Sequence, residues 1–252
     1  MRGIAILAAA AALFTAQDAF AAGNAEAPKS VDWAHEGLFG TYDRAAAQRG
    51  MQVYREVCSG CHGLNYIAFR NLTEIGLTED QAKVVAAEYT IVDGPNDEGE
   101  MFERPGKLSD YFPAPFENEK AARAANSGAM PPDLSLIVKA RPGFENYLYS
   151  LLTGYGEPPE NVELMEGMFY NPYFPGHQIA MGEPLGEDAV EYADGTKATA
   201  EQIATDVTTF LAWAAEPELE ERKRLGIKVL LFLIVLTAML YALKRQIWKD
   251  LH

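Results

Sequence analysis

The stretch Cys58-Ser59-Gly60-Cys61-His62 contains both cysteines of the 252-residue chain, and a histidine directly follows the second one. Two thiols three residues apart can each add to one of the two vinyl groups on one edge of a porphyrin. The adjacent histidine can then reach the iron, so this spacing is typical of c-type haem attachment. The motif predicts one covalent haem c, held by Cys58 and Cys61, with His62 as an iron ligand.

Two other interpretations of the cysteine pair are a redox dithiol and one half of a zinc site. A thioredoxin-like dithiol normally follows a strand and is rarely followed by histidine, and a zinc site needs two further ligands at a fixed spacing. Because the chain has no other cysteine, it cannot form a disulfide framework or a four-thiolate metal site. The composition therefore favours haem.

The second axial ligand of the iron must come from a distant part of the chain. Met130 directly precedes Pro131-Pro132, whereas His177 and Met181 lie in a segment rich in Pro and Gly. A loop stiffened by these residues can hold a thioether on iron, although a single Met is often only a core side chain. From the residues alone, Met181, Met130 and His177 all remain open.

The charge balance separates possible classes of partner. Acidic residues outnumber basic ones by 36 to 21, which argues against nucleic-acid binding, because that function needs basic residues to contact the phosphates. Residues 93–119 contain eight acids against two basic residues, and residues 157–194 contain nine acids and no Lys or Arg. Such clusters suit a basic partner surface, with plain solubility as the alternative.

Residues 1–21 read as an export signal. Arg2 gives a short positive start, residues 4–14 are apolar, and Ala19-Phe20-Ala21 forms a small-x-small cleavage site. The apolar part is too short to span a bilayer. We therefore expect a bacterial secretory signal removed after Ala21, the alternative being an apolar helix that stays attached.

Residues 225–243 form a second apolar run, long enough as a helix to cross the hydrocarbon core. A buried core helix is the alternative, but no polar face interrupts the run. Basic residues flank both ends, so the export signal decides the orientation. The sequence predicts a haem domain at 22–224 on the periplasmic side of the bacterial inner membrane, a single-pass anchor at 225–243 and a cytoplasmic tail at 244–252.

The rest of the chain predicts a mostly α fold with long ordered loops. Capping boxes are expected for Thr78 with Gln81 and for Thr199 with Gln202. Residues 93–119 and 154–198 read as loops, and no alternating strand pattern persists. The expected helices cover residues 41–57, 78–88, 116–126 and 144–152, with a last helix that begins at Thr199 and is ended by Pro217.

Several longer runs carry a resemblance to a known family. They are Val-Tyr-Arg-Glu-Val-Cys at 53–58, Asp-Gly-Pro-Asn-Asp-Glu-Gly-Glu-Met-Phe at 93–102, Arg-Pro-Gly-Lys-Leu-Ser-Asp-Tyr-Phe-Pro at 104–113, Pro-Pro-Asp-Leu-Ser at 131–135, Leu-Leu-Thr-Gly-Tyr at 151–155, Asn-Pro-Tyr-Phe-Pro-Gly at 171–176 and Trp-Ala-Ala-Glu-Pro at 213–217. From about residue 31 to its C-terminus, the chain resembles the cytochrome c1 family, the membrane-anchored haem subunits of cytochrome bc1 complexes.

The resemblance implies a cytochrome c-type haem domain and a role for each matching position. Cys58 and Cys61 would hold the haem, and His62 and Met181 would be the axial ligands. The remaining matches are Arg141 and Tyr147 at the haem propionates and Pro131 and Pro132 along the haem edge. The departures are His177, where some relatives carry another polar residue, and the absence of the extra cysteine pair of some bacterial members.

The resemblance also implies a function without bond chemistry on this chain. The haem would accept an electron from a Rieske iron–sulfur protein and pass it to a cytochrome c, within a dimeric complex that includes cytochrome b. Two other classes stay open: a haem enzyme or gas sensor with an open sixth position, and an anchored cytochrome that serves a different dehydrogenase or oxidase.

Overall fold

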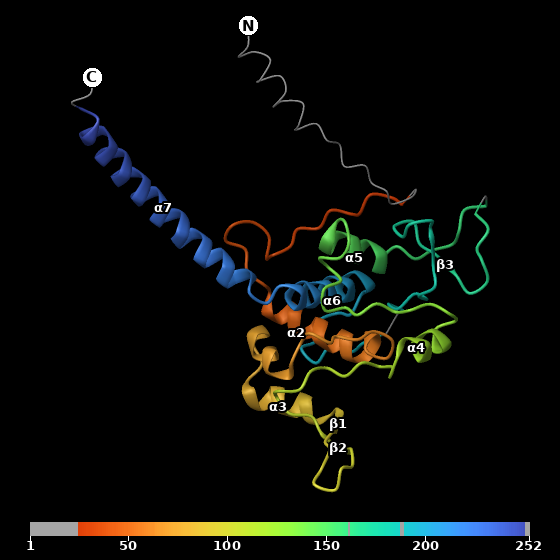
Figure 1. Cartoon of the computed structure of the whole chain (residues 1–252). Coiled ribbons are helices and arrows are strands. Elements are labelled where there is room, and N and C mark those ends of the chain that lie inside the picture. The colour runs from red at the N-terminus through yellow and green to blue at the C-terminus, as the bar shows by residue number, and fades with distance from the viewer. Residues whose placement is uncertain (1–24, 161, 187–188, 250–252) are drawn as a thin grey trace.

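The computed structural model describes residues 25–160, 162–186 and 189–249. A mostly helical domain carries one long helix, α7 (Leu219–Ile247), which extends away from it (Figure 1). The predicted mostly α fold with one C-terminal apolar helix is therefore confirmed. The predicted signal peptide at 1–21 lies outside the described residues.

The core is built on the contact between α2 (Arg44–Val53) and α6 (Ala200–Ala215). The side chain of Asp43 accepts hydrogen bonds from the backbone N–H groups of Ala45 and Ala46, at 2.9 and 3.1 Å. This N-cap starts the helix three residues later than the predicted position 41. At its other end α2 continues as a π-helical turn, Tyr54–Cys58, so the helix leads directly into the cysteine motif.

At Gly50 the two helices lie close together. A Cβ atom on Gly50 would lie 2.0 Å from the carbonyl oxygen of Asp206 and 2.7 Å from Cβ of Phe210. Beside this contact, the Arg49 guanidinium donates two hydrogen bonds of 2.9 Å to the fully buried carboxylate of Asp206. A buried carboxylate needs such a partner, because burial of an unpaired charge is costly.

We expect Gly50→Ala to destabilise the protein by about 2 kcal/mol. Overpacking against a backbone costs roughly 3 kcal/mol, and the better helix propensity of Ala returns about 1 kcal/mol. Chemical denaturation followed by circular dichroism measures the change. Gly156→Ala is the matched control, because a Cβ on Gly156 would meet no atom within 4 Å. Equal stability of the two variants would show that the helices can separate freely.

The smaller helices follow the predicted positions closely. Thr78 and Gln81 form the predicted capping box at the start of α3 (Glu79–Ala87), and α5 (Phe144–Leu152) has the predicted bounds. The predicted helix at 116–126 begins later, because the side chain of Asn118 accepts a hydrogen bond from the N–H of Ala121. The bounds are Phe69–Ile75 for a 3₁₀ helix, Glu79–Ala87 for α3, Glu119–Ala125 for α4 and Phe144–Leu152 for α5.

The second predicted capping box is only half formed. The Thr199 hydroxyl accepts a hydrogen bond of 3.2 Å from the backbone N–H of Gln202, as expected. The side chain of Gln202 instead donates to Asp206 Oδ1 at 3.0 Å. In a full capping box the Gln202 amide oxygen would accept from the N–H of Thr199, but that N–H donates to the carbonyl oxygen of Lys197 at 3.0 Å instead.

Short strands interrupt the two predicted loops. β1 (Thr90–Asp93) pairs antiparallel with β2 (Phe102–Pro105), and β3 (Phe169–Tyr170) pairs antiparallel with β4 (Gln178–Ile179). Segments of two to four residues are too short for an alternating pattern to be recognised. The prediction of ordered loops without strands is therefore wrong at these two places.

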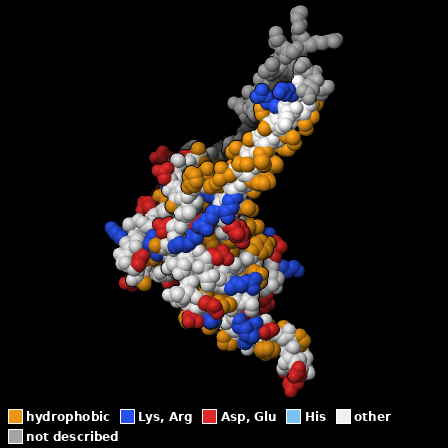
Figure 2. All heavy atoms as spheres, turned by 90° about the vertical axis from the view of Figure 1, so that its left-hand side faces the viewer, with side chains coloured by type: hydrophobic (Ala, Val, Ile, Leu, Met, Phe, Trp, Pro, Cys, Tyr) orange, Lys and Arg blue, Asp and Glu red, His pale blue; other side chains and the backbone are white. Residues whose placement is uncertain are grey.

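Helix α7 contains the predicted apolar span and begins before it. Its length and composition suffice to cross a membrane, and none of its most apolar window is buried. Figure 2 shows hydrophobic side chains along its length. The foot is attached to the domain by Glu220, which accepts hydrogen bonds from the Arg44 guanidinium at 2.8 and 3.0 Å and from the N–H of Tyr42 at 2.9 Å.

Candidate functional site

The cysteine motif forms one compact turn at the end of the π-helical segment Tyr54–Cys58. The N–H groups of Cys61 and His62 both donate to the carbonyl oxygen of Cys58, at 3.1 and 2.9 Å. Both cysteines are free thiols, Cys58 partly buried and Cys61 exposed. The turn therefore presents two thiols and an imidazole within five residues, which is the donor set that covalent haem attachment requires.

The environment of Cys58 does not suit a redox dithiol. Burial, with a smaller contribution from the neighbouring Cys61, raises the pKa of the Cys58 thiol to about 12. Reactive dithiols have a lowered pKa, because the thiolate is the nucleophile. A buried, protonated thiol argues against thiol–disulfide exchange at this motif.

His62 is held in the tautomer that can ligate a metal. Its Nδ1 lies 2.7 Å from the carbonyl oxygen of Pro132, which can only accept, so Nδ1 carries the proton. Burial lowers the pKa of the ring more than the hydrogen bond to Pro132 raises it, which favours the neutral form. A neutral imidazole with Nδ1 bound to a carbonyl leaves the Nε2 lone pair for iron.

The loop that carries Pro131 and Pro132 lies against the residues that follow the motif. Asp133 accepts from the N–H of Asn65 at 2.9 Å, and the Ser135 hydroxyl accepts from the N–H of Tyr66 at 3.1 Å. These bonds, with the one from His62 to the Pro132 carbonyl, place the loop beside His62. Sequence reasoning missed the part played by Asp133, although it directly follows the Pro-Pro pair.

The three open candidates for the second axial ligand differ in their packing. Met130 is 45% exposed, whereas the Met181 side chain is partly buried and packs against the core. The backbone of Met181 is held by the Tyr155 hydroxyl, which donates to its carbonyl oxygen at 3.0 Å. The His177 ring packs edge-on against Tyr170, with ring centroids 6.1 Å apart. Met181 is therefore the more buried of the two methionines, and its loop is held by a hydrogen bond from Tyr155.

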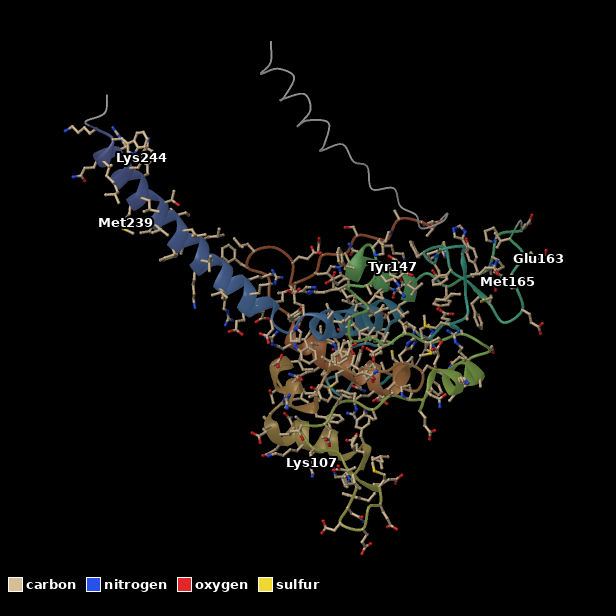
Figure 3. The ribbon with its side chains drawn as sticks, in the orientation of Figure 1. Lys107, Tyr147, Glu163, Met165, Met239 and Lys244 are labelled. Atoms are coloured by element: carbon tan, nitrogen blue, oxygen red, sulfur yellow. The ribbon has the colours of Figure 1, made fainter. Side chains whose placement is uncertain are left out.

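Arg141 lies close to Tyr147. Tyr147 is a buried residue of α5 (Figure 3), and burial raises its pKa, while the charge and hydrogen bond of Arg141 act in the opposite direction. Burial likewise raises the pKa of Tyr155, and Tyr147 contributes to this shift. Tyr155 also holds the backbone of the Met181 loop through its hydroxyl. Sequence reasoning missed it, although it ends one of the runs that carry the resemblance.

A zinc site finds no support in the described part of the chain, because no group of three or more His, Cys, Asp or Glu side chains converges there. The nitrogen, thioether and thiol groups fit a haem c instead. A mostly helical domain with a Cys-x-x-Cys-His turn, a neutral histidine and a packed methionine belongs to the class of c-type cytochromes.

Comparison with known proteins identifies the family. Residues 33–251 match the model of the Cytochrome C1 family, so the chain belongs to this family, and membership implies haem binding. It is 54% identical to "Cytochrome c1" of Rhodospirillum rubrum over 87% of this chain and 86% of that protein. It is 55% identical to the "Cytochrome b-c1 complex catalytic subunit, mitochondrial" of Candida albicans over 89% of this chain and 78% of that protein. It is 50% identical to "Cytochrome b/c1" of Bradyrhizobium diazoefficiens over 98% of this chain but 39% of that longer protein.

The structure divides the acidic clusters into paired and outward-facing groups. Arg104 pairs with Asp93 and with Asp110, and holds the pKa of both carboxyl groups below the usual value. Asp194 pairs with Arg49 at 3.1 Å. Because these three acids are paired within the chain, fewer carboxylates are available to a partner than the two acidic segments contain.

Proposed function

We propose that this chain is the haem-bearing electron-transfer subunit of a quinol–cytochrome c oxidoreductase, the cytochrome bc1 complex. Cys58 and Cys61 would hold the haem covalently, and His62 and Met181 would be its iron ligands. The hydrogen bond that orients the His62 ring on the Pro132 carbonyl is the observation that carries the proposal. The names of two relatives, a subunit of a cytochrome b-c1 complex and a cytochrome b/c1, support it.

A haem held by these residues would supply one-electron chemistry, which would carry an electron from a Rieske iron–sulfur protein to a cytochrome c. His62 and Met181 would both ligate its iron, which would leave no position for oxygen or another substrate. Methionine opposite histidine also favours the ferrous state and raises the reduction potential. This arrangement favours electron transfer over a haem enzyme or gas sensor.

The remaining site residues position the group. Arg141 and the Tyr147 hydroxyl would bind the propionates, because a cation and a donor offset the cost of carboxylates beside a buried porphyrin. Pro131 and Pro132 would line the haem edge, where a rigid apolar loop excludes water. The outward-facing acids of residues 93–119 and 157–194 would attract a basic cytochrome c.

The proposed topology follows the segments of the sequence. Residues 1–21 would be a signal peptide, and residues 22–224 would form the haem domain on the periplasmic side of a bacterial inner membrane. Residues 225–243, within α7, would cross the membrane once and leave a cytoplasmic tail at 244–252. Cytochrome b and the iron–sulfur protein would be the partners, in a dimeric complex.

We expect the tagged chain, purified from its native membranes in mild detergent, to bring with it a dihaem cytochrome b and a Rieske protein. Optical spectra detect the b-type haems, and electron paramagnetic resonance (EPR) detects the iron–sulfur cluster. The preparation should oxidise quinol while reducing cytochrome c. Co-purification with another dehydrogenase or an oxidase, and without cytochrome b, would identify a different anchored cytochrome.

A further inference from the structure

A tight loop, residues 33–41, lies beside the foot of α7 (Figure 1). The N–H of Thr41 donates to the carbonyl oxygen of Ala34 at 3.1 Å, which closes the loop. A Cβ atom on Gly40 would lie only 1.9 Å from the carbonyl oxygen of Glu36, so only glycine fits there. The backbone is therefore built for one conformation.

The base of this loop is fixed to α5. The indole N–H of Trp33 donates to Asn146 Oδ1 at 2.9 Å, and His35 Nε2 lies 3.0 Å from Glu145 Oε1. Both Trp33 and His35 are buried. Because its base is packed and hydrogen-bonded, the loop holds its tip in a defined place.

Lys223 connects the same loop to α7. Its Nζ donates to the carbonyl oxygens of His35 and Gly40, at 2.6 and 3.0 Å, which bracket the tip. Lys223 precedes the apolar run 225–243 by two residues, which is a rise of about 3 Å along a helix. The loop therefore stands close to the level at which the proposed membrane span begins.

The tip of the loop consists of two bulky apolar side chains directed away from the core. Leu38 is 57% exposed and Phe39 is 80% exposed. A single exposed apolar residue is ordinary, but two neighbours on a rigid loop at the start of an apolar span form a local contact surface. The hydrophobic side chains of α7 reach down to the same end of the domain (Figure 2).

We propose that Leu38 and Phe39 enter the headgroup region of the bilayer and form a second attachment of the haem domain to the membrane. The proposal rests on the proposed spanning of the membrane by α7. Exposed apolar and aromatic side chains favour this interface. Arg224, next to Lys223 in α7, has a side chain that is 73% exposed and can meet a lipid phosphate, whereas Arg222 donates to Glu216. A single helix lets a domain swivel about its axis, whereas two contacts restrict its tilt and hence the direction of the haem edge.

The test is a measurement of depth at position 39 in the full-length haem protein, reconstituted in nanodiscs of phosphatidylcholine and phosphatidylglycerol. Phe39→Cys carries a spin label, and EPR compares its collisions with oxygen, which enters lipid, and with a polar nickel chelate. Met165→Cys is the matched control, because Met165 is 62% exposed on the side of the domain away from α7 (Figure 3). A label at Val235→Cys reports on the span itself.

We expect the oxygen-to-nickel ratio at position 39 to exceed that at position 165 several-fold and to stay below the ratio at position 235, which lies near the middle of the span. Equal ratios at positions 39 and 165, with a lipid-exposed label at position 235, would overturn the proposal and leave the anchor intact. A water-exposed label at position 235 would instead refute the span. The label at position 39 could also collide with nickel in the isolated subunit but be shielded from both probes in a larger complex. That result would show that a protein covers the loop, and it would also overturn the proposal.

Discussion

Replacing Met181 by Leu should lower the midpoint potential of the haem by on the order of 0.1–0.3 V, within the roughly 0.8 V range that axial ligands cover. Leucine keeps the apolar volume but has no sulfur lone pair, so the ferrous state loses its stabilising ligand. The sixth position then opens, and the reduced protein should bind carbon monoxide. Redox titration followed at the absorption bands of the haem measures the first effect, and the spectrum under carbon monoxide measures the second.

Met130→Leu is the matched control for this substitution. Met130 is also a methionine in a proline-rich loop, but its side chain is 45% exposed. We expect it to leave both the midpoint potential and the carbon monoxide response unchanged. The opposite pattern would assign the ligand to Met130. If neither variant changes the midpoint potential or carbon monoxide binding, His177 becomes the candidate ligand.

The double substitution of Cys58 and Cys61 by Ser should abolish covalent haem attachment. A hydroxyl does not form the thioether that joins each cysteine to a vinyl group, so no haem can survive denaturation on the chain. Haem staining of a denaturing gel, with the protein matured in its native host, should show complete loss of the stained band. Pyridine haemochrome spectra should give one c-type haem per unaltered chain.

Ser59→Ala provides the control within the same turn. The Ser59 hydroxyl donates to the carbonyl oxygen of Arg55 at 2.8 Å and contributes no group to the proposed thioethers. This variant should keep the stained band at nearly the level of the unaltered protein. A stained band in the double cysteine variant, or none in the unaltered chain, would contradict covalent attachment at this motif.

Local signals account for most of what could be predicted. The Thr78–Gln81 capping box, the bounds of α5 and the end of α6 before Pro217 all depend on side chains within a few residues of one another. Capping and proline effects act over this range, so they can be recognised without tertiary structure. The paired strands escaped detection, because their partners lie about ten residues away and each strand is short.

The candidate site shows the same division. The cysteine motif is a local pattern and could be recognised directly, whereas the choice among Met181, Met130 and His177 could not be made from spacing. Burial and the Tyr155 hydroxyl distinguish Met181, and both depend on segments that are distant in sequence. The resemblance to a family implied this residue, and its difference from Met130 in burial is visible only in the packing.

By itself, the sequence determined the haem-binding motif, the helical class and the apolar C-terminal helix, because each depends on neighbouring residue types or on a continuous run. Only the tertiary structure decided that α2 and α6 meet at Gly50, which acids are paired within the fold, and which loop stands beside the long helix. These features require backbone atoms from distant parts of the chain to meet. Such tertiary contacts depend on how the whole core packs, so no local sequence pattern predicts them.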